Sequence, residues 1–298
     1  MIILIGLQLR RRLTTRATKK YFIPALVTKL IGVLSFALVY QFYFKGGDTF
    51  TYYYASKVSF WQAFLNNPSD FFKLLKLPSR GIDPDVQHYV SGTYAYFTYV
   101  GPEEWFLTKI VGVLSLFTFN SYIAISFIFG LFCFLGTWKI FQTFLAFYPQ
   151  EHKLLSWSVL YIPCCLFWAS GLLKDTVVLG AMGFLFHYAL QFSFFRRKII
   201  WSVLMCVFSY WLLDSLKGFV ANSFLPIFAV WVFLKYKEKL KSTLLQAGSF
   251  LFMLSLFPVA AYFVFNTVLA EIQNQKIFKE IQEKVEGFQL DHGRMNYS

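Results

Sequence analysis

The sequence predicts an all-α protein, a polytopic bundle of about seven membrane-spanning helices with a long outer loop of interfacial helices after the first span. Two observations predict this class. Of the 298 residues, 57% are hydrophobic and only 14% are charged, whereas soluble domains carry about 25% charged residues. Apolar runs of roughly 20 residues also recur along the chain, which is the length that a helix needs to cross a bilayer.

The distribution of charge favours a membrane protein over a nucleic-acid-binding protein. The formal net charge is +13, but the basic residues gather in short segments between the apolar runs, as the positive-inside bias requires. We therefore expect membrane lipid, and no nucleic acid, among the partners. The sequence contains no H-x-x-x-H pair, no Walker-type glycine loop and no serine-hydrolase order, so it predicts neither a metal site nor a cofactor. The cysteines lie in predicted spans without C-x-x-C spacing and are expected to be buried apolar residues: Cys133, Cys164, Cys165 and Cys206.

Residues 1–20 are predicted to form a basic cytoplasmic N-terminus, and residues 21–266 the transmembrane domain. The opening apolar stretch is too short to span, and the basic residues follow it, in the reverse order of a signal peptide. The first predicted span, residues 22–44, leaves the cytoplasm. Lys29 lies inside this span, and we expect its ammonium group to extend back toward the cytoplasmic surface.

The outer loop is predicted to occupy residues 45–120. The spacing of its apolar residues predicts a surface helix over residues 50–65 and a shorter one over residues 69–77, followed by an irregular, tyrosine-rich stretch over residues 78–101. Residues 103–118 are apolar but short. If they crossed the membrane, a later basic cluster would fall outside, so the positive-inside bias predicts that they lie at the interface.

The remaining spans follow the outer loop. They are residues 121–147, 154–169 with a kink at Pro163, 176–194, 199–213, 219–234 and 243–265. Within the fourth of all the predicted spans, His187 is expected to be packed and hydrogen-bonded rather than to relay protons. Residues 267–298 have apolar residues at helical spacing, and we expect an outer-face helical tail after which the chain could continue.

Three polar segments share the outer side in this topology: Gly46-Gly47-Asp48, Ser170–Asp175 and Asp214–Lys217. Ionisable residues near membrane depth are functional candidates. We therefore expect the three segments to outline one pocket; the alternative is that water solvates each of them separately.

Asp48 is the candidate catalytic residue. A carboxylate at the mouth of a helix bundle can act as a general base toward a sugar-acceptor hydroxyl, and Gly46 and Gly47 let the backbone turn tightly beside it. The tyrosines that follow are expected either to stack on a sugar or to lie in the aromatic belt at the lipid headgroups: Tyr52, Tyr53 and Tyr54.

The candidate substrate-binding residues are mainly cations. Lys174 is suited to bind a phosphate as a point charge, and Arg80 and Lys217 are further candidates of this kind. Asp175 is favoured by the dipole of the returning helix, which explains it structurally. His88 lies in the outer loop, where a lone histidine is more often solvated than bound to a substrate.

The segment from residue 22 to residue 147 resembles the polyprenyl-phosphate-sugar-dependent glycosyltransferases of the GT-C class. Those enzymes begin with one span and a large outer loop, whose first residues carry an acidic motif followed by a tyrosine. Surface helices, a short apolar helix and a glycine-containing apolar span come next. The corresponding pieces here are Gly47-Asp48-Thr49 with Tyr52, residues 50–77, Trp105 to Phe119 and Asn120 to Phe147.

A second segment, Ile162 to Asp175, is similar to one in uncharacterised GT-C-like multi-span proteins of Bacteroidota. GT-C enzymes commonly have two nearby carboxylates in the first loop, and here Thr49 stands beside Asp48. A second carboxylate would come from later in the loop only if the loop folds back, and the candidates are Asp83, Asp85, Glu103 and Glu104.

The resemblance implies an integral-membrane glycosyltransferase of the bacterial cytoplasmic membrane. It would take a sugar from a polyprenyl-phosphate donor at the outer face and pass it to a glycan, lipid or protein acceptor in envelope polysaccharide biosynthesis. Asp48 would be the base, and Lys174 would hold the donor phosphate. Two other functions stay open. A transporter or lipid-glycan flippase predicts polar residues along mid-span faces and an inverted repeat, and a non-catalytic subunit of an envelope-polysaccharide system would tolerate loss of Asp48.

Overall fold

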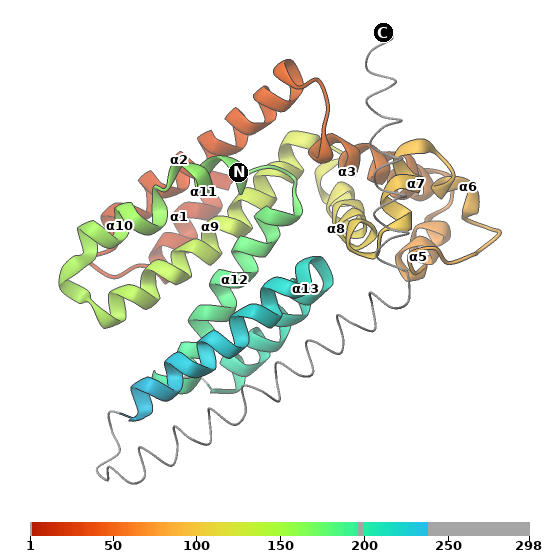
Figure 1. Ribbon diagram of the computed structural model, residues 1–298. Helices are drawn as coiled ribbons and strands as arrows, with labels where there is room; N and C mark the ends of the chain where they lie inside the picture. The colour runs from red at the N-terminus through yellow and green to blue at the C-terminus, as the bar shows by residue number, and fades with distance from the viewer. Residues whose placement is uncertain (1, 196–198, 238–298) are drawn as a thin grey trace. The chain divides into compact units, whose positions relative to one another are not determined.

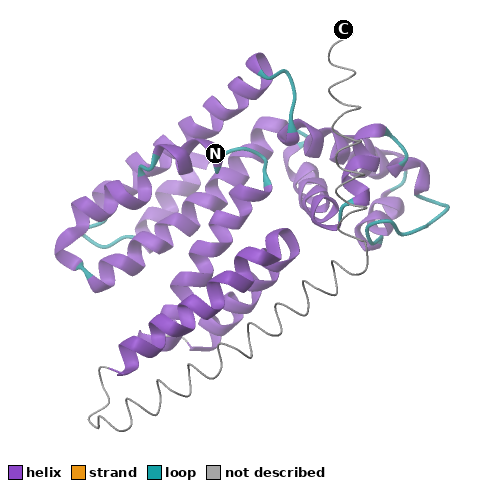
Figure 2. Ribbon diagram, in the orientation of Figure 1, coloured by secondary structure: helices purple, strands orange, loops and turns teal. Residues whose placement is uncertain are grey.

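A computed structural model describes residues 2–195 and 199–237. All the regular elements in these residues are helices, and no strand occurs among them (Figure 2), which confirms the predicted all-α class for this part of the chain. The last predicted span, residues 243–265, and the predicted tail, residues 267–298, lie outside the described residues. Met1–Ser223 forms one compact unit, and the contacts described below lie within it.

Four helices in the described residues are long and apolar enough to cross a membrane: Lys19–Tyr43, Tyr122–Phe147, Lys174–Phe194 and Ile199–Phe224. They correspond to α2 (Lys19–Leu38) with the π-helical Val39–Tyr43, α9 (Tyr122–Phe147), α12 (Lys174–Leu190) with the π-helical Gln191–Phe195, and the first part of α13 (Ile199–Lys237). These helices indicate a membrane protein and coincide with four of the predicted spans. The total of seven spans stays a prediction.

The segment predicted as a span over residues 154–169 folds differently. It forms two short helices, α10 (His152–Leu160) and α11 (Pro163–Trp168), and neither reaches the roughly 20 residues that cross a bilayer. Pro163 is the first residue of α11 and lacks the N–H of a helical hydrogen bond, while Ile162 before it is extended (φ −66°, ψ 115°). The expected kink is therefore a complete break.

α13 is interrupted at Lys217, whose backbone is not helical (φ −153°, ψ 73°). The hydroxyl group of Tyr210 donates to Oδ1 of Asn222 at 3.1 Å, across 12 residues of sequence. In a continuous helix, residues so separated lie about 18 Å apart along the axis. The chain therefore reverses direction at this point, as the predicted turn over residues 214–218 requires, and the part of Ile199–Phe224 that coincides with the predicted span over residues 199–213 ends before Lys217.

The closest packing between apolar helices joins α9 and α12, which run side by side (Figure 1). A Cβ on Gly136 would overlap the backbone of Gly180, and one on Gly183 would overlap the backbone of Gly136. Small residues of this kind let helix backbones approach closely in lipid, where van der Waals packing drives association. α2 also packs on α9, and α1 (Ile2–Leu13) packs on α2. The largest buried side chains of this region are aromatic: Phe22, Phe134, Trp138 and Phe141.

The segment predicted to be an outer loop folds into a helical group, residues 48–118, which we call the loop domain (Figure 1). Its helices are α3 (Asp48–Ser56), the π-helical Lys57–Trp61, α4 (Gln62–Asn66), α5 (Pro68–Lys76), α6 (Gln87–Val90), α7 (Thr93–Val100) and α8 (Pro102–Thr118). A buried core of its own holds the group together: Phe60, Phe71, Leu74, Val86, Tyr89, Tyr99 and Trp105. Because large apolar side chains point into this core, the loop helices are stabilised by one another as well as by any surface on which they lie.

The loop domain contains more regular structure than the sequence predicts. The expected helix over residues 69–77 corresponds to α5, but the stretch expected to be irregular, residues 78–101, includes α6 and α7. α8 has 17 residues and packs on α3 and α7. It is not among the four helices with the length and apolarity of a span.

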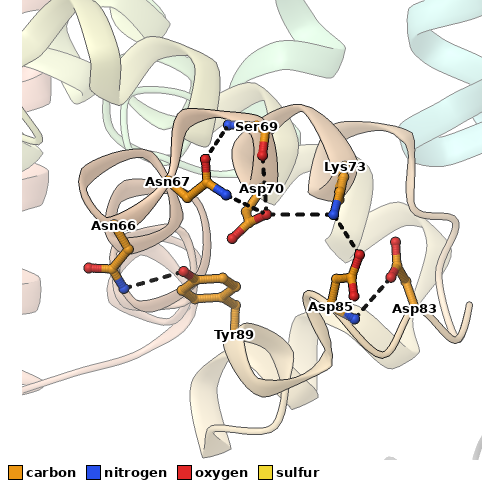
Figure 3. Close-up of polar contacts among 8 residues, drawn as sticks. All are labelled: Asn66, Asn67, Ser69, Asp70, Lys73, Asp83, Asp85 and Tyr89. Atoms are coloured by element: carbon orange, nitrogen blue, oxygen red, sulfur yellow. Dashed lines mark hydrogen bonds and ion pairs between the residues drawn. The ribbon is translucent and has the colours of Figure 1, made fainter.

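A polar network covers the start of α5 (Figure 3). Asn67 is extended (φ −152°, ψ 108°), and its Oδ1 accepts a hydrogen bond from the N–H of Ser69 at 3.2 Å, with Pro68 at the first helical position. Lys73, one turn further on, lies 2.6 Å from Asp85 and 3.8 Å from Asp70. The sequence Asn-Pro therefore specifies this helix start locally, since both residues satisfy the rules for a helix N-terminus.

Replacing Asn67 with alanine is expected to destabilise α5 by about 1 kcal/mol, because the cap on the N–H of Ser69 is lost. Amide hydrogen exchange of α5 in the detergent-solubilised protein measures this change. Lys76→Gln, on the same helix, is the control and should change exchange by less than about 0.5 kcal/mol. Equal exchange in the two variants would contradict the capping role.

Candidate functional site

The chain enters the loop domain through Gly46 and Gly47. Gly47 has a φ of +104°, which residues with a Cβ rarely adopt. A Cβ at this position would also lie 2.8 Å from the ring of Tyr40, whereas the space around Gly46 is open. Asp48 follows as the first residue of α3, where the helix dipole favours a carboxylate. The turn therefore needs glycine at position 47 to place Asp48.

We expect Gly47→Ala to destabilise the protein by about 2 kcal/mol, because the backbone is strained and the Tyr40 ring must move. Gly92→Ala is the control, because Gly92 has a φ of −70° and open space around it, and it should change stability by less than about 0.5 kcal/mol. Thermal unfolding of the two solubilised variants measures the difference, and equal unfolding midpoints would count against the close approach of Tyr40.

The ammonium group of Lys174 links α12 to the loop domain. Its Nζ lies 2.9 Å from Oε2 of Glu103 and 2.9 Å from Oε1 of Glu104, both in the first turn of α8. The side chains of Lys174 and Glu104 are 16% and 13% exposed, whereas that of Glu103 is 42% exposed. Both carboxylates therefore neutralise the lysine, and Glu103 is the partner that water reaches more easily.

A second ion pair lies beside the first. The ammonium group of Lys217, at the break in α13, contacts the carboxylate of Asp175, the second residue of α12. The start of α12 thus meets the reversal of α13, which brings together two of the three polar segments that the sequence places on one side.

Asp48 belongs electrostatically to the same group. The pKa of its carboxyl group is raised, first because the surrounding protein removes hydration and then because Glu104 and Asp175 carry like charge, while Lys174 opposes this effect. The residue itself still reaches solvent. All three polar segments therefore contribute to one charged cluster, which we define as Asp48, Glu103, Glu104, Lys174, Asp175 and Lys217.

The charged cluster holds four carboxylates and two ammonium groups, so its net charge is negative when all of them are ionised. A carboxylate in such surroundings is a better match for proton transfer near neutral pH than a free aspartate. The ammonium group of Lys174 contacts two of the carboxylates, and that of Lys217 contacts one. Among the described residues, no group of three or more histidine, cysteine or acidic side chains is arranged to hold a metal ion.

The tyrosines after Asp48 take three different positions. Tyr52 is 5% exposed, and burial, followed by the charge of Glu104, raises the pKa of its hydroxyl group. The prediction that Tyr52 stacks on a sugar or lies among headgroups is therefore not met, because its ring is packed inside. Tyr53 donates to the carbonyl of Asn120 at 2.9 Å, and Tyr54 remains partly exposed.

Two predicted binding residues lie elsewhere in the loop domain. Nε of Arg80 donates to the carbonyl of Val100 at 3.0 Å, which places Arg80 beside the chain that enters α8. His88 is exposed on α6, and its ring packs against that of Tyr89, with centroids 3.9 Å apart. His88 thus has the solvated position that the sequence also allows.

The prediction for Lys29 is wrong. Lys29 does not reach the surface: it is 3% exposed, and its ammonium group donates to the carbonyls of Cys165 at 3.0 Å and Ala169 at 2.7 Å. These carbonyls lie at the C-terminal end of α11, where a cation is favoured by the helix dipole. His187 is buried and bonded as expected, with Nδ1 2.7 Å from Oγ1 of Thr143.

The sequence predicts Glu103 and Glu104 as site residues only on the condition that the loop folds back toward Asp48. Their local signal is a helix start, since they follow Pro102 at the first position of α8, where acidic residues are favoured in any case. Nothing in that signal distinguishes a capping glutamate from a member of a site. The fold of the loop domain brings both glutamates to Lys174.

Comparison with other proteins adds no relative: the chain matches no protein family, no curated protein and no solved structure.

Proposed function

We propose that the protein is an integral-membrane glycosyltransferase that takes a sugar from a lipid-phosphate carrier. The observation that carries this proposal is the ion pair of Lys174 with Glu103 and Glu104 at the start of α12, a helix with the length and apolarity of a membrane span. The charges of Lys174 and Glu104 also act on the carboxyl group of Asp48. A carboxylate base and cations at the end of such a helix are what transfer from a membrane-bound phosphate ester requires.

In the proposed reaction, Asp48 accepts the proton of the acceptor hydroxyl group while the oxygen of that hydroxyl group forms a bond to the anomeric carbon of the sugar. The bond between that carbon and the phosphate oxygen breaks, and the lipid phosphate leaves with the bonding electrons. An ammonium group stabilises the charge that develops on the leaving phosphate. Lys174 is suited to this role because it lies close enough to Asp48 to influence its pKa.

Lys174 is already paired, so a donor phosphate has to replace one of its carboxylate partners. Glu103 is the partner to be replaced, because its side chain is 42% exposed and that of Glu104 only 13%. An exposed carboxylate that loses its cation is hydrated by water, so the loss costs little. A buried carboxylate left without its cation stays poorly hydrated, so that loss costs more. Glu104 then stays beside Lys174 and provides the second carboxylate near Asp48 that the resemblance to GT-C enzymes leads us to expect.

The test compares surface glycans of the native host carrying the normal gene, a deletion, or Asp48→Asn. If the proposal holds, the deletion and Asp48→Asn lose the same glycan while the variant protein is present in the membrane at its normal level. Normal glycans in the Asp48→Asn strain would reject the catalytic role. A loss seen only in the deletion would instead identify a non-catalytic subunit of an envelope-polysaccharide system.

The flippase or transporter alternative has less support. It calls for ionisable residues that face a pathway within the membrane. Lys29 and His187 are ionisable residues inside the described spans, but they face no pathway: both are buried and hydrogen-bonded to neighbouring groups of the protein.

A further inference from the structure

A groove of about 350 Å³ lies next to the charged cluster, between α11, α12 and α13. Its walls are almost wholly apolar, and Asp175 is the one charged residue in them. The lining residues are Cys164, Cys165, Trp168, Ala169, Asp175, Val178, Leu179, Met182 and Val220. Water needs two to four polar partners to be stable in a cavity, and these walls offer few, so the groove is suited to an apolar occupant.

The shape of the groove follows from the sequence of α12. Asp175, Val178, Leu179 and Met182 line it, and positions three and four apart form one stripe of a helix. From Asp175 to Met182 this stripe is about 10 Å long. One end of the stripe is Asp175, which pairs with Lys217, and its other residues are apolar. Charge therefore lies at one end of the stripe only.

We propose that this groove binds one hydrocarbon chain, prenyl or acyl, of a membrane amphiphile whose polar head lies at the Asp175–Lys217 pair. α12 and α13 have the length and apolarity of membrane spans, so hydrocarbon is the medium expected around their apolar faces. The volume falls within the range of small-molecule sites, about 300–1,000 Å³. The ion pair at one end can contact the polar head of the lipid, and the apolar stripe can pack against its hydrocarbon chain.

This binding site goes beyond the proposed sugar transfer, because it needs no catalysis. It is adjacent to the cluster that holds Lys174, so a lipid bound here would have its head close to Asp48. The groove itself depends only on the packing of the three helices and on the pattern of α12.

The experiment uses the full chain in phosphatidylcholine nanodiscs with a photoreactive chain at low mole fraction. Two probes are compared: a farnesyl monophosphate and a dodecyl monophosphate, each with a terminal diazirine. After irradiation, mass spectrometry maps the adducts. We expect both probes, or one of them, to give adducts on residues 164–168 and 178–182 that saturate as probe is added and that unlabelled farnesyl or dodecyl monophosphate reduces.

Leu179→Trp and Met182→Trp fill the groove and should reduce these adducts to background. Leu204→Trp is the matched control, because it adds the same ring at an exposed position of α13 outside the lining, and it should leave them unchanged. Size-exclusion chromatography checks that each variant is folded. If one groove variant does not fold, the other still tests the proposal.

Adducts that rise linearly with probe, or that persist in both groove variants, would overturn the proposal, since they would report bulk lipid. A saturable signal with farnesyl monophosphate alone assigns the groove to prenyl chains, and one with dodecyl monophosphate alone assigns it to acyl-type chains; each supports chain binding. Asp48→Asn is expected to keep the adducts, so failure of the transfer proposal and failure of this one are separate results.

Discussion

Replacing Asp48 with asparagine is expected to slow sugar transfer by about 100-fold or more, the contribution of a positioned general base. Asparagine keeps the size and hydrogen-bonding shape of the side chain but cannot accept the proton of the acceptor hydroxyl. Pulse-labelling of the affected glycan in host membranes measures the rate. Asp83→Asn is the control, because it removes a carboxylate of the same loop outside the charged cluster, and it should leave the rate within about twofold.

The pH dependence of transfer gives an independent check on Asp48. A general base accepts a proton only when it is deprotonated. The rate should therefore be low at pH values below the pKa of Asp48 and should rise as the pH increases through that pKa. That pKa is raised by lost hydration and by Glu104, and lowered by Lys174. Glu104→Gln and Asp175→Asn each remove a negative charge that raises this pKa, so each should move the acid limb of the profile to lower pH. A shift to higher pH in either variant would contradict the assignment.

Replacing Lys174 with methionine is expected to destabilise the protein by about 2 kcal/mol as well as to abolish donor binding. Glu104 would be left with a poorly hydrated carboxylate and no cation, which is the main cost of breaking a buried ion pair. This loss of stability is smaller than that expected for a fully buried ion pair, because the side chain of Glu103 is partly in water. Thermal unfolding of the solubilised protein measures this change.

Two further variants separate the structural role of Lys174 from its functional one. Lys174→Met combined with Glu104→Gln should recover most of the lost stability, because the unpaired carboxylate is gone, yet transfer should stay abolished. Lys217→Met removes a lysine from the more exposed pair with Asp175, whose side chain is 58% exposed, and should cost less than about 1 kcal/mol. Recovery of transfer in the double variant would show that Lys174 serves stability alone.

The sequence by itself determined the features that depend on neighbouring residues. Composition and run length indicate apolar helices, and the structure has four of spanning length and apolarity in its described part. The turn at Gly46–Gly47 and the reversal near Lys217 were also visible, because glycine and short polar residues restrict the local backbone. These signals act within a few residues, so one sequence suffices to detect them.

Tertiary structure alone decided which charges meet. Glu103 and Glu104 lie about seventy positions before Lys174, and no spacing rule connects residues across such a loop. The same holds for Lys29, which is buried on the carbonyls of α11, and for Tyr52, which is packed inside the loop domain. A hydrogen bond or ion pair between distant segments depends on how the helices pack, and packing is set by the summed fit of many side chains. Asp48 is a candidate that its own sequence neighbours suggest, whereas the fold determines which carboxylates and ammonium groups act on its pKa.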